Sequence, residues 1–307
     1  MPTPTLSQAR SHSARQRRIT AGVLVAVRRL FKRNAPLTEV VSTVATYQLA
    51  SAMASAQSVA LFAEAPTPIT TPAAFAGVSS YGFPIAEPII ATIDRFAPAP
   101  AEPIPANWWE TTADFMAALE QLIAAEVQDA GRTASQVEIV GRPDWTNYVR
   151  LLNPPSCSRC AVLAGRIYRD LEAFQRHPLC DCVMVPVTSW EDAHDKGLVS
   201  SPQDLFDRGQ MTGLSEADNQ AIRDGADITT IVNATRGTSA PGITNALTTE
   251  VFGRKVKATT YGTTKRAAWR KANPTRLVRL RPESIYRFAE SHEDAVRLLR
   301  LYGYLSD

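Results

Sequence analysis

The sequence predicts an α+β protein that is predominantly α, with helical N-terminal arms and a small β element in the C-terminal domain. Apolar residues recur at helical spacing over three long stretches, whereas the alternation typical of strands is confined to short ones. A chain of 307 residues that is 45% hydrophobic and 21% charged can also bury a core without disulfide support. These observations favour a helical globular protein.

Three segments are predicted to form long helices. The first spans residues 7–33, and the second spans residues 37–63, after a proline that suits a helix start. The small Ala and Ser side chains of the second helix allow another helix to approach closely, so we expect the first two helices to pair as a hairpin. The alternative is that the first helix binds to a membrane surface. The third spans residues 108–131 and is expected to stop at Gly131. The apolar stripe of the first helix consists of Ile19, Val23, Ala26, Val27 and Leu30.

Shorter elements are predicted after the third helix. Residues 137–141 and 182–187 read as strands, and residues 143–152 resemble a helical turn that carries aromatic side chains. Further short helices are expected to begin after Ser201, which precedes a proline, and after Ser215, because serine is a favoured N-cap residue.

Proline content and charge divide the chain into parts. Most of the 21 prolines lie in residues 66–105, where they exclude long helices and central strands. The predicted parts are a basic helical hairpin or arm (1–65), a Pro-rich linker region (66–105), a helical core with a Cys/His motif (106–236), a basic flexible loop (237–275) and C-terminal helices (276–307).

The net charge of +3 conceals a segregated distribution. Residues 1–38 contain eight Lys and Arg and no acid, and residues 251–282 contain ten and no acid. The remainder of the chain carries 15 basic and 30 acidic residues. Such basic blocks contact nucleic acid, dock on acidic protein surfaces, or are simply solvated. The candidate contact residues are Arg15, Arg17, Arg18, Arg28, Arg29, Lys255, Lys257, Lys265, Arg266 and Arg270.

No apolar run is long enough to span a membrane, and the apolar patch near the N-terminus lacks a signal-peptide cleavage site. We therefore expect the protein to fold in a reducing cytoplasm, where clustered cysteines are more often metal ligands than disulfides.

All four cysteines lie within one short stretch. Cys157 and Cys160 form C-x2-C, and His177, Cys180 and Cys182 follow as H-x2-C-x-C. Tetrahedral zinc requires four converging soft or borderline donors, so this spacing predicts a structural zinc site that staples the C-terminal domain. Two ligand sets remain open: the four thiolates, or three thiolates with His177 in place of one member of the C-x-C.

Other interpretations of the cysteines are buried thiols that only pack, disulfides, catalytic zinc, and a nucleophilic Cys157–His177 pair. A closed four-ligand site leaves no open position for catalysis, and G-x-S-x-G, H-E-x-x-H, P-loop and G-x-G-x-x-G motifs are absent. The sequence therefore predicts no catalytic residue.

The run NYVRLLNPPSCSRCAVLAGRIYR, followed by FQRHPLCDCVMVPV, resembles the minor capsid proteins of tailed phages of actinobacteria, which are related to the Mu F-like head morphogenesis family. That family carries C-x2-C and H-P-x-C-x-C elements. The stretch FDRGQMTGLSEADNQAIRDGADITTIVNATRG and the closing AVRLLRLYGYL are also similar, so the resemblance covers roughly residues 36–307. The Mu F-like pattern usually has a basic residue between the last two cysteines, where this chain has Asp181.

The resemblance implies a low-copy virion protein that is made in the host cytoplasm and is associated with the portal and the capsid interior. Its implied partners are the portal protein and the major capsid or scaffold protein, with phage DNA as a further partner that the basic blocks suggest, and with no membrane. Proteins of this group often carry the label capsid maturation protease, which makes a protease acting on head proteins the alternative function.

Overall fold

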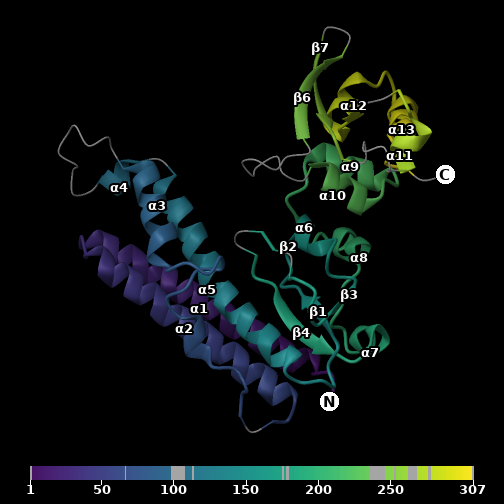
Figure 1. The fold of residues 1–307 in the computed structure, drawn as a ribbon. Coiled ribbons are helices and arrows are strands. Elements are labelled where there is room, and N and C mark those ends of the chain that lie inside the picture. The colour runs from purple at the N-terminus through teal and green to yellow at the C-terminus, as the bar shows by residue number, and fades with distance from the viewer. Residues whose placement is uncertain are drawn as a thin grey trace. The chain divides into compact units, whose positions relative to one another are not determined.

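The computed structural model describes residues 2–65, 67–97, 108–112, 114–174, 176–177, 180–235, 246–251, 254–261, 268–275 and 278–305. Helices dominate and the sheets are small, which confirms the predicted α+β class (Figure 1). Within these ranges no helix has the length and apolar character needed to cross a membrane. The chain divides into two compact units, one formed by Met1–Asn153 and Ala164–Ser200 and the other by Pro154–Leu163 and Ser201–Asp307.

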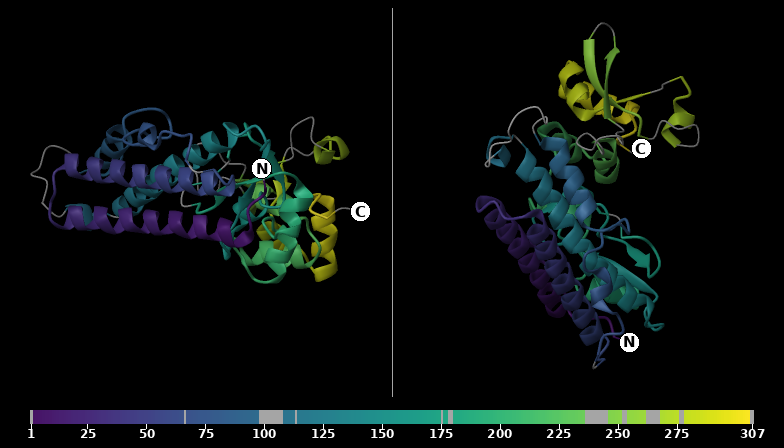
Figure 2. Two further views of the ribbon diagram at one scale, coloured as in Figure 1. Left: turned by 90° about the horizontal axis from the view of Figure 1, so that it is seen from below. Right: turned by 60° about the vertical axis from the view of Figure 1, so that its left-hand side comes forward.

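Three long helices form the first unit's bundle: α1 (Leu6–Lys32), α2 (Leu37–Phe62) and α5 (Phe115–Val140). Each packs against the other two, and α1 and α2 run antiparallel, side by side (Figure 2). Helix α1 begins with a capping box, in which the backbone N–H of Gln8 donates to Thr5 Oγ1 and the backbone N–H of Thr5 donates to Gln8 Oε1. Both N-terminal helices therefore lie where the sequence predicts them.

Apolar residues from all three helices meet in one core. Shorter elements of the unit are η1 (Pro72–Phe75), α3 (Ala86–Phe96) and α4 (Trp108–Thr111), and α3 packs against α5. Four members of the predicted stripe of α1 are confirmed: Val23, Val27 and Leu30 are buried in this core and Ile19 packs against it, whereas Ala26 is not part of it. The buried residues of the core are Val23, Val27 and Leu30 from α1, Val40 and Val44 from α2, Ile85 at the N-cap of α3, Ile89 from α3, and Phe115, Leu119, Ile123 and Val127 from α5.

A three-stranded antiparallel sheet completes the first unit, in the order β3 (Ile167–Arg169), β1 (Asn147–Leu151), β4 (Val183–Val187). Every residue of β4 is buried, because apolar side chains cover both faces of the sheet. On one face Val149 pairs with Val185, and on the other Tyr148 stacks on Tyr168 with ring centroids 5.1 Å apart. The predicted strand at 182–187 is confirmed. Helix α7 (Trp190–Asp195) follows β4.

The second unit consists of short helices and two small sheets. Strand β2 (Ser156–Cys157) pairs in parallel with β5 (Met211–Thr212), and the sheet order β6 (Ala246–Val251), β7 (Arg254–Thr259), β8 (Arg279–Leu280) is antiparallel. Ser201 and Ser215 are N-caps, as predicted, and two helices close the chain as predicted. The helices are α6 (Ser158–Ala161), α8 (Pro202–Asp207), α9 (Glu216–Arg223), α10 (Ile228–Thr235), α11 (Ala268–Ala272), α12 (Pro282–Phe288) and α13 (His292–Leu301).

Helix α5 corrects two predictions. It passes through Gly131 without stopping and continues to Val140, so the predicted strand at 137–141 is the last helical turn. The reason is tertiary: the buried Glu138 carboxylate accepts a hydrogen bond from the Thr70 amide and pairs with Arg142, which holds this segment helical despite its β-branched residues.

Gly131 lies inside a helix because α1 and α2 approach it closely. A Cβ at this position would lie 2.5 Å from Ser51 Oγ and 2.9 Å from both Gln16 Oε1 and Ser55 Oγ. These side chains already hydrogen-bond to one another, since Gln16 Nε2 donates to Ser55 Oγ at 2.9 Å and Ser51 Oγ donates to Gln16 Oε1 at 2.6 Å. A methyl group would therefore break a buried polar contact.

We expect Gly131→Ala to destabilise the protein by about 1–3 kcal/mol, because overpacking outweighs the roughly 1 kcal/mol that alanine gains in helix propensity. Urea denaturation measures the change. Ser51→Ala should recover part of the loss in the double variant, because it removes the closest atom. A Gly131→Ala variant as stable as the wild type, or more stable, would contradict the close approach.

Two further predictions are wrong. Residues 143–152 contain strand β1 where a helical turn was expected, because this segment pairs with β3 along one edge and with β4 along the other. The side chains of Val149 and Tyr148 pack into different core clusters. The predicted loop at 237–275 contains the β6–β7 hairpin and helix α11. Val256 and Ala258 of β7 are buried, and this alternation with exposed lysines gives the segment a core face that a loop would lack.

Candidate metal centre

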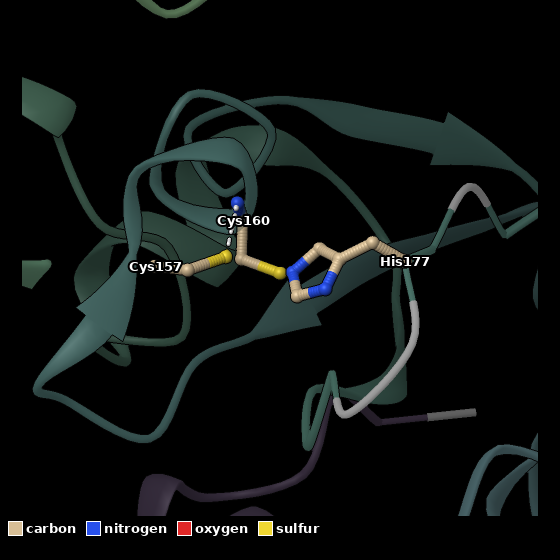
Figure 3. Close-up of side chains that lie close together, drawn as sticks. All are labelled: Cys157, Cys160 and His177. Carbon is tan, nitrogen blue, oxygen red and sulfur yellow. Dashed lines mark hydrogen bonds between the residues drawn. The ribbon is translucent and has the colours of Figure 1, made fainter. Parts of the chain in front are cut away.

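The C-x2-C begins where strand β2 ends. Cys157 is the N-cap of the short helix α6, and its sulfur accepts a hydrogen bond from the Cys160 amide at 3.4 Å (Figure 3). Cys157 is half-buried and Cys160 is buried, so the two thiols are shielded to different degrees.

The second group of donors lies on the approach to strand β4. The Cys180 amide donates to the His177 carbonyl at 3.2 Å, which links these two candidate ligands, and Cys182 directly precedes the strand. Cys180 and Cys182 are both buried. No disulfide joins the four cysteines, contrary to the disulfide interpretation.

The donor atoms fall into two overlapping groups. Cys157, Cys160 and His177 have ligand atoms within 4.8 Å of one another, and so do Cys160, Cys180 and Cys182. The Cys160 sulfur points toward the His177 ring in Figure 3. A tetrahedral zinc ion with zinc–sulfur distances of about 2.3 Å places its sulfurs about 3.8 Å apart, which lies within the 4.8 Å limit that each group meets. The five residues can hold a metal, and Cys160 is common to both groups.

Two buried arginines surround the C-x-C. Arg132 of α5 donates to the Cys180 carbonyl and, at 3.2 Å, to the Cys182 carbonyl. Arg150 of β1 lies with its Nη1 3.7 Å from the Cys180 sulfur. A cation beside a sulfur favours the thiolate, which is the form that binds metal. Arg132 therefore holds the backbone of both cysteines, and Arg150 places a positive charge beside the Cys180 sulfur.

Arg132 is itself held by a buried network. Its Nη1 lies 3.0 Å from Asp129 Oδ1, and Asp129 also pairs with Arg176. The guanidinium carbon of Arg132 lies 5.4 Å from the centroid of the Phe174 ring. Because the charge is paired and the donors are used, the arginine can remain buried at 8% exposure.

Asp181, between the last two cysteines, is fixed by α1 and the preceding loop. Its carbonyl accepts from the Asn153 amide group at 3.1 Å, and Asn153 accepts in turn from Ser13 Oγ at 2.8 Å. Burial raises the pKa of the Asp181 carboxyl, the neighbouring Cys180 raises it further, and the positive charge of Arg17 opposes this shift. The chain therefore places a cation from α1 near the Asp181 carboxyl.

Arg17 and Asp181 also line a small polar cavity with His12. His12 is buried, and burial, aided by the charge of Arg15, lowers its pKa to about 4, so its ring is neutral at pH 7. Of the two α1 residues named here, Arg17 therefore brings a positive charge to this cavity and His12 brings none.

The predicted basic residues lie in separate places. Arg15, Arg17, Arg18, Arg28 and Arg29 are all on α1, whereas Lys255 and Lys257 are on β7 and Arg270 is on α11. Lys265 and Arg266 lie outside the described residues. The five predicted basic residues of the N-terminal block therefore lie on one helix.

Sequence reasoning missed Arg132 and Arg150. Arg150 had a signal, because a charged residue within the apolar run YVRLL must find a partner if the run is a buried strand. Arg132 had none, since it follows Gly131 at the point where the helix was expected to end.

A protein-family model described as VG15 protein matches residues 86–208. The match covers less than half of the chain, but it contains the whole cysteine segment and all five candidate ligands. This similarity to a viral family suggests a phage protein. No curated protein and no solved structure matches the chain.

Proposed function

We propose that the protein is a structural minor capsid protein that acts in head morphogenesis of a tailed phage, in association with the portal and the capsid interior. The observation that carries the proposal is the family match over residues 86–208, because it includes the cysteine segment on which the resemblance to Mu F-like minor capsid proteins depends. The host cytoplasm would be the site of synthesis, and the virion the final location.

Zinc in this proposal has a structural role. Three of the four thiols are buried, and the five candidate donors suffice for a closed tetrahedral site. The carbonyls of Cys180 and Cys182 are held by Arg132, which fixes the backbone that carries two of the donors. A metal held this way stabilises the local fold, as in proteins whose folding depends on structural zinc.

The position of the protein in purified particles tests the proposal. We expect mass spectrometry of intact heads to find it at low copy relative to the major capsid protein, and chemical cross-linking to join it to the portal or major capsid protein. Its absence from purified heads would contradict the proposal. Incubation with the major capsid and scaffold proteins tests the protease alternative: new termini that disappear after one Ser or Cys substitution would replace a structural role with an enzymatic one.

A further inference from the structure

Helix α1 has two chemically opposite faces. One face is buried in the bundle and carries only uncharged side chains. All eight basic residues of the N-terminal block are exposed. At 100° per residue their positions fall within an arc of about 160° on the opposite side of the helix. They are Arg10, Arg15, Arg17, Arg18, Arg28, Arg29, Lys32 and Arg33.

Most of this charge is not neutralised by the protein. Within the described part of the chain, ion pairs engage only two of the eight, Arg28 with Glu120 and Arg33 with Glu39. Helix α2, which pairs with α1, contains no Lys or Arg, and Glu39 is its only acid. The outward face of α1 is therefore a strip of positive charge in which six of the eight cations form no ion pair within the described residues.

The second basic block is used differently. Arg279 is buried, donates to the Tyr302 and Gly303 carbonyls at 2.8 Å each, and lies 4.5 Å from the Tyr304 ring centroid. Glu283 pairs with Arg281 at 2.7 Å and with Lys257 at 3.7 Å. Several cations of this block thus stabilise their own unit, whereas those of α1 face solvent.

We propose that the exposed face of α1 binds the phosphate backbone of duplex DNA without sequence preference. Seven of its eight cations are arginines, whose guanidinium groups bind phosphate oxygens in bidentate geometry. Arg10 and Lys32 are separated by 22 residues, about 33 Å along the helix, which is close to one turn of B-DNA.

The residues between the cations explain the choice of a duplex. The other exposed positions of this face include Ser7, Ser11, Ala21 and Val25, whose short side chains allow a backbone to approach. Exposed aromatic residues, on which single-stranded bases stack, do not occur among them. This inference stands on the charge of α1 and does not depend on the proposed place of the protein in the phage head.

Fluorescence anisotropy with the full-length protein and two unrelated 30-bp DNA duplexes tests the proposal. We expect equal binding to both duplexes and an affinity that falls steeply with salt. The triple variant Arg18→Gln, Arg29→Gln, Lys32→Gln should weaken binding at least about tenfold and reduce the salt slope by about three, since each phosphate contact contributes about one. These side chains are exposed and form no ion pair within the described residues, so circular dichroism should show an unchanged fold.

A charge-matched control comes from the second basic block. The variant Lys255→Gln, Lys257→Gln, Lys271→Gln removes the same charge from exposed positions and should retain affinity within about twofold if α1 carries the binding. Equal losses in the two triple variants, no binding to duplex DNA, or tighter binding to single strands or to polyglutamate would overturn the proposal.

Discussion

Replacing Cys160 with serine is expected to abolish stoichiometric zinc binding and to cause the largest loss of stability of any single cysteine substitution. Cys160 is the only donor shared by both groups of candidate ligands, so its loss leaves two donors in each. Structural zinc contributes on the order of 10 kcal/mol to the folding of zinc-finger peptides at neutral pH, so a loss of several kcal/mol is expected here. Elemental analysis and thermal unfolding, with and without a chelator, measure both effects.

The wild-type protein should carry about one zinc per chain and lose thermal stability on chelation. The Cys160→Ser protein should carry almost none and respond little to chelator. Ser158→Ala, two residues before Cys160 on α6, is the control, because Ser158 is not among the candidate ligands. Wild-type zinc content in Cys160→Ser, or a chelator-insensitive wild type, would contradict a structural zinc site.

The same measurements decide between the two ligand sets. If four thiolates bind, His177→Asn should keep its zinc while each cysteine variant loses it. If His177 binds, His177→Asn should lose zinc. One member of the C-x-C would then not be a ligand, so serine should be tolerated at one of Cys180 and Cys182 but not at the other.

Replacing Arg132 with methionine is expected to destabilise the protein by about 3–5 kcal/mol, because it removes one partner of a buried ion pair and leaves two cysteine carbonyls without their donor. Asp129 keeps Arg176 as a partner, which limits the loss. We also expect zinc affinity to fall about 10–100-fold, since groups that orient metal ligands have effects of this size. Urea denaturation and competition with a zinc chelator measure the two changes.

Arg166→Met provides a matched control. Arg166 also pairs with a carboxylate, Glu172, at 3.0 Å, but both side chains are exposed, so its loss should cost less than about 1 kcal/mol. Arg132→Lys should restore only part of the stability, because one ammonium cannot reproduce the guanidinium fork. Equal effects of the Arg132 and Arg166 substitutions would show that burial does not make the Arg132 network important.

Long helices could be predicted from the sequence because their signals are local. Val23, Val27 and Leu30 repeat at helical spacing, and Thr5, Ser201 and Ser215 stand at helix starts, where the side chain accepts a backbone hydrogen bond. Gly131 misled the prediction because a glycine has two uses that look alike in sequence: ending a helix, or allowing other elements to come close. Only the positions of Ser51 and Gln16 distinguish them.

The candidate metal ligands were predictable for a similar reason. The C-x2-C and H-x2-C-x-C spacings place donors within a few residues of each other, and the structure brings all five into two overlapping groups. The supporting arginines were not predictable, since Arg132 meets the Cys182 carbonyl across 50 residues and Arg150 meets the Cys180 sulfur across 30.

By itself, the sequence determined the predominantly helical α+β class, the candidate metal ligands and the segregation of charge, because each depends on residue type and short spacing. The tertiary structure alone decided which basic block is free. Arg279 and Arg281 are drawn into hydrogen bonds and ion pairs of their own unit, whereas the arginines of α1 lie on the face opposite its apolar stripe. The two basic blocks are alike in composition but differ in burial. A charge loses its hydration when it is buried and must then be paired within the protein, whereas an exposed charge need not be.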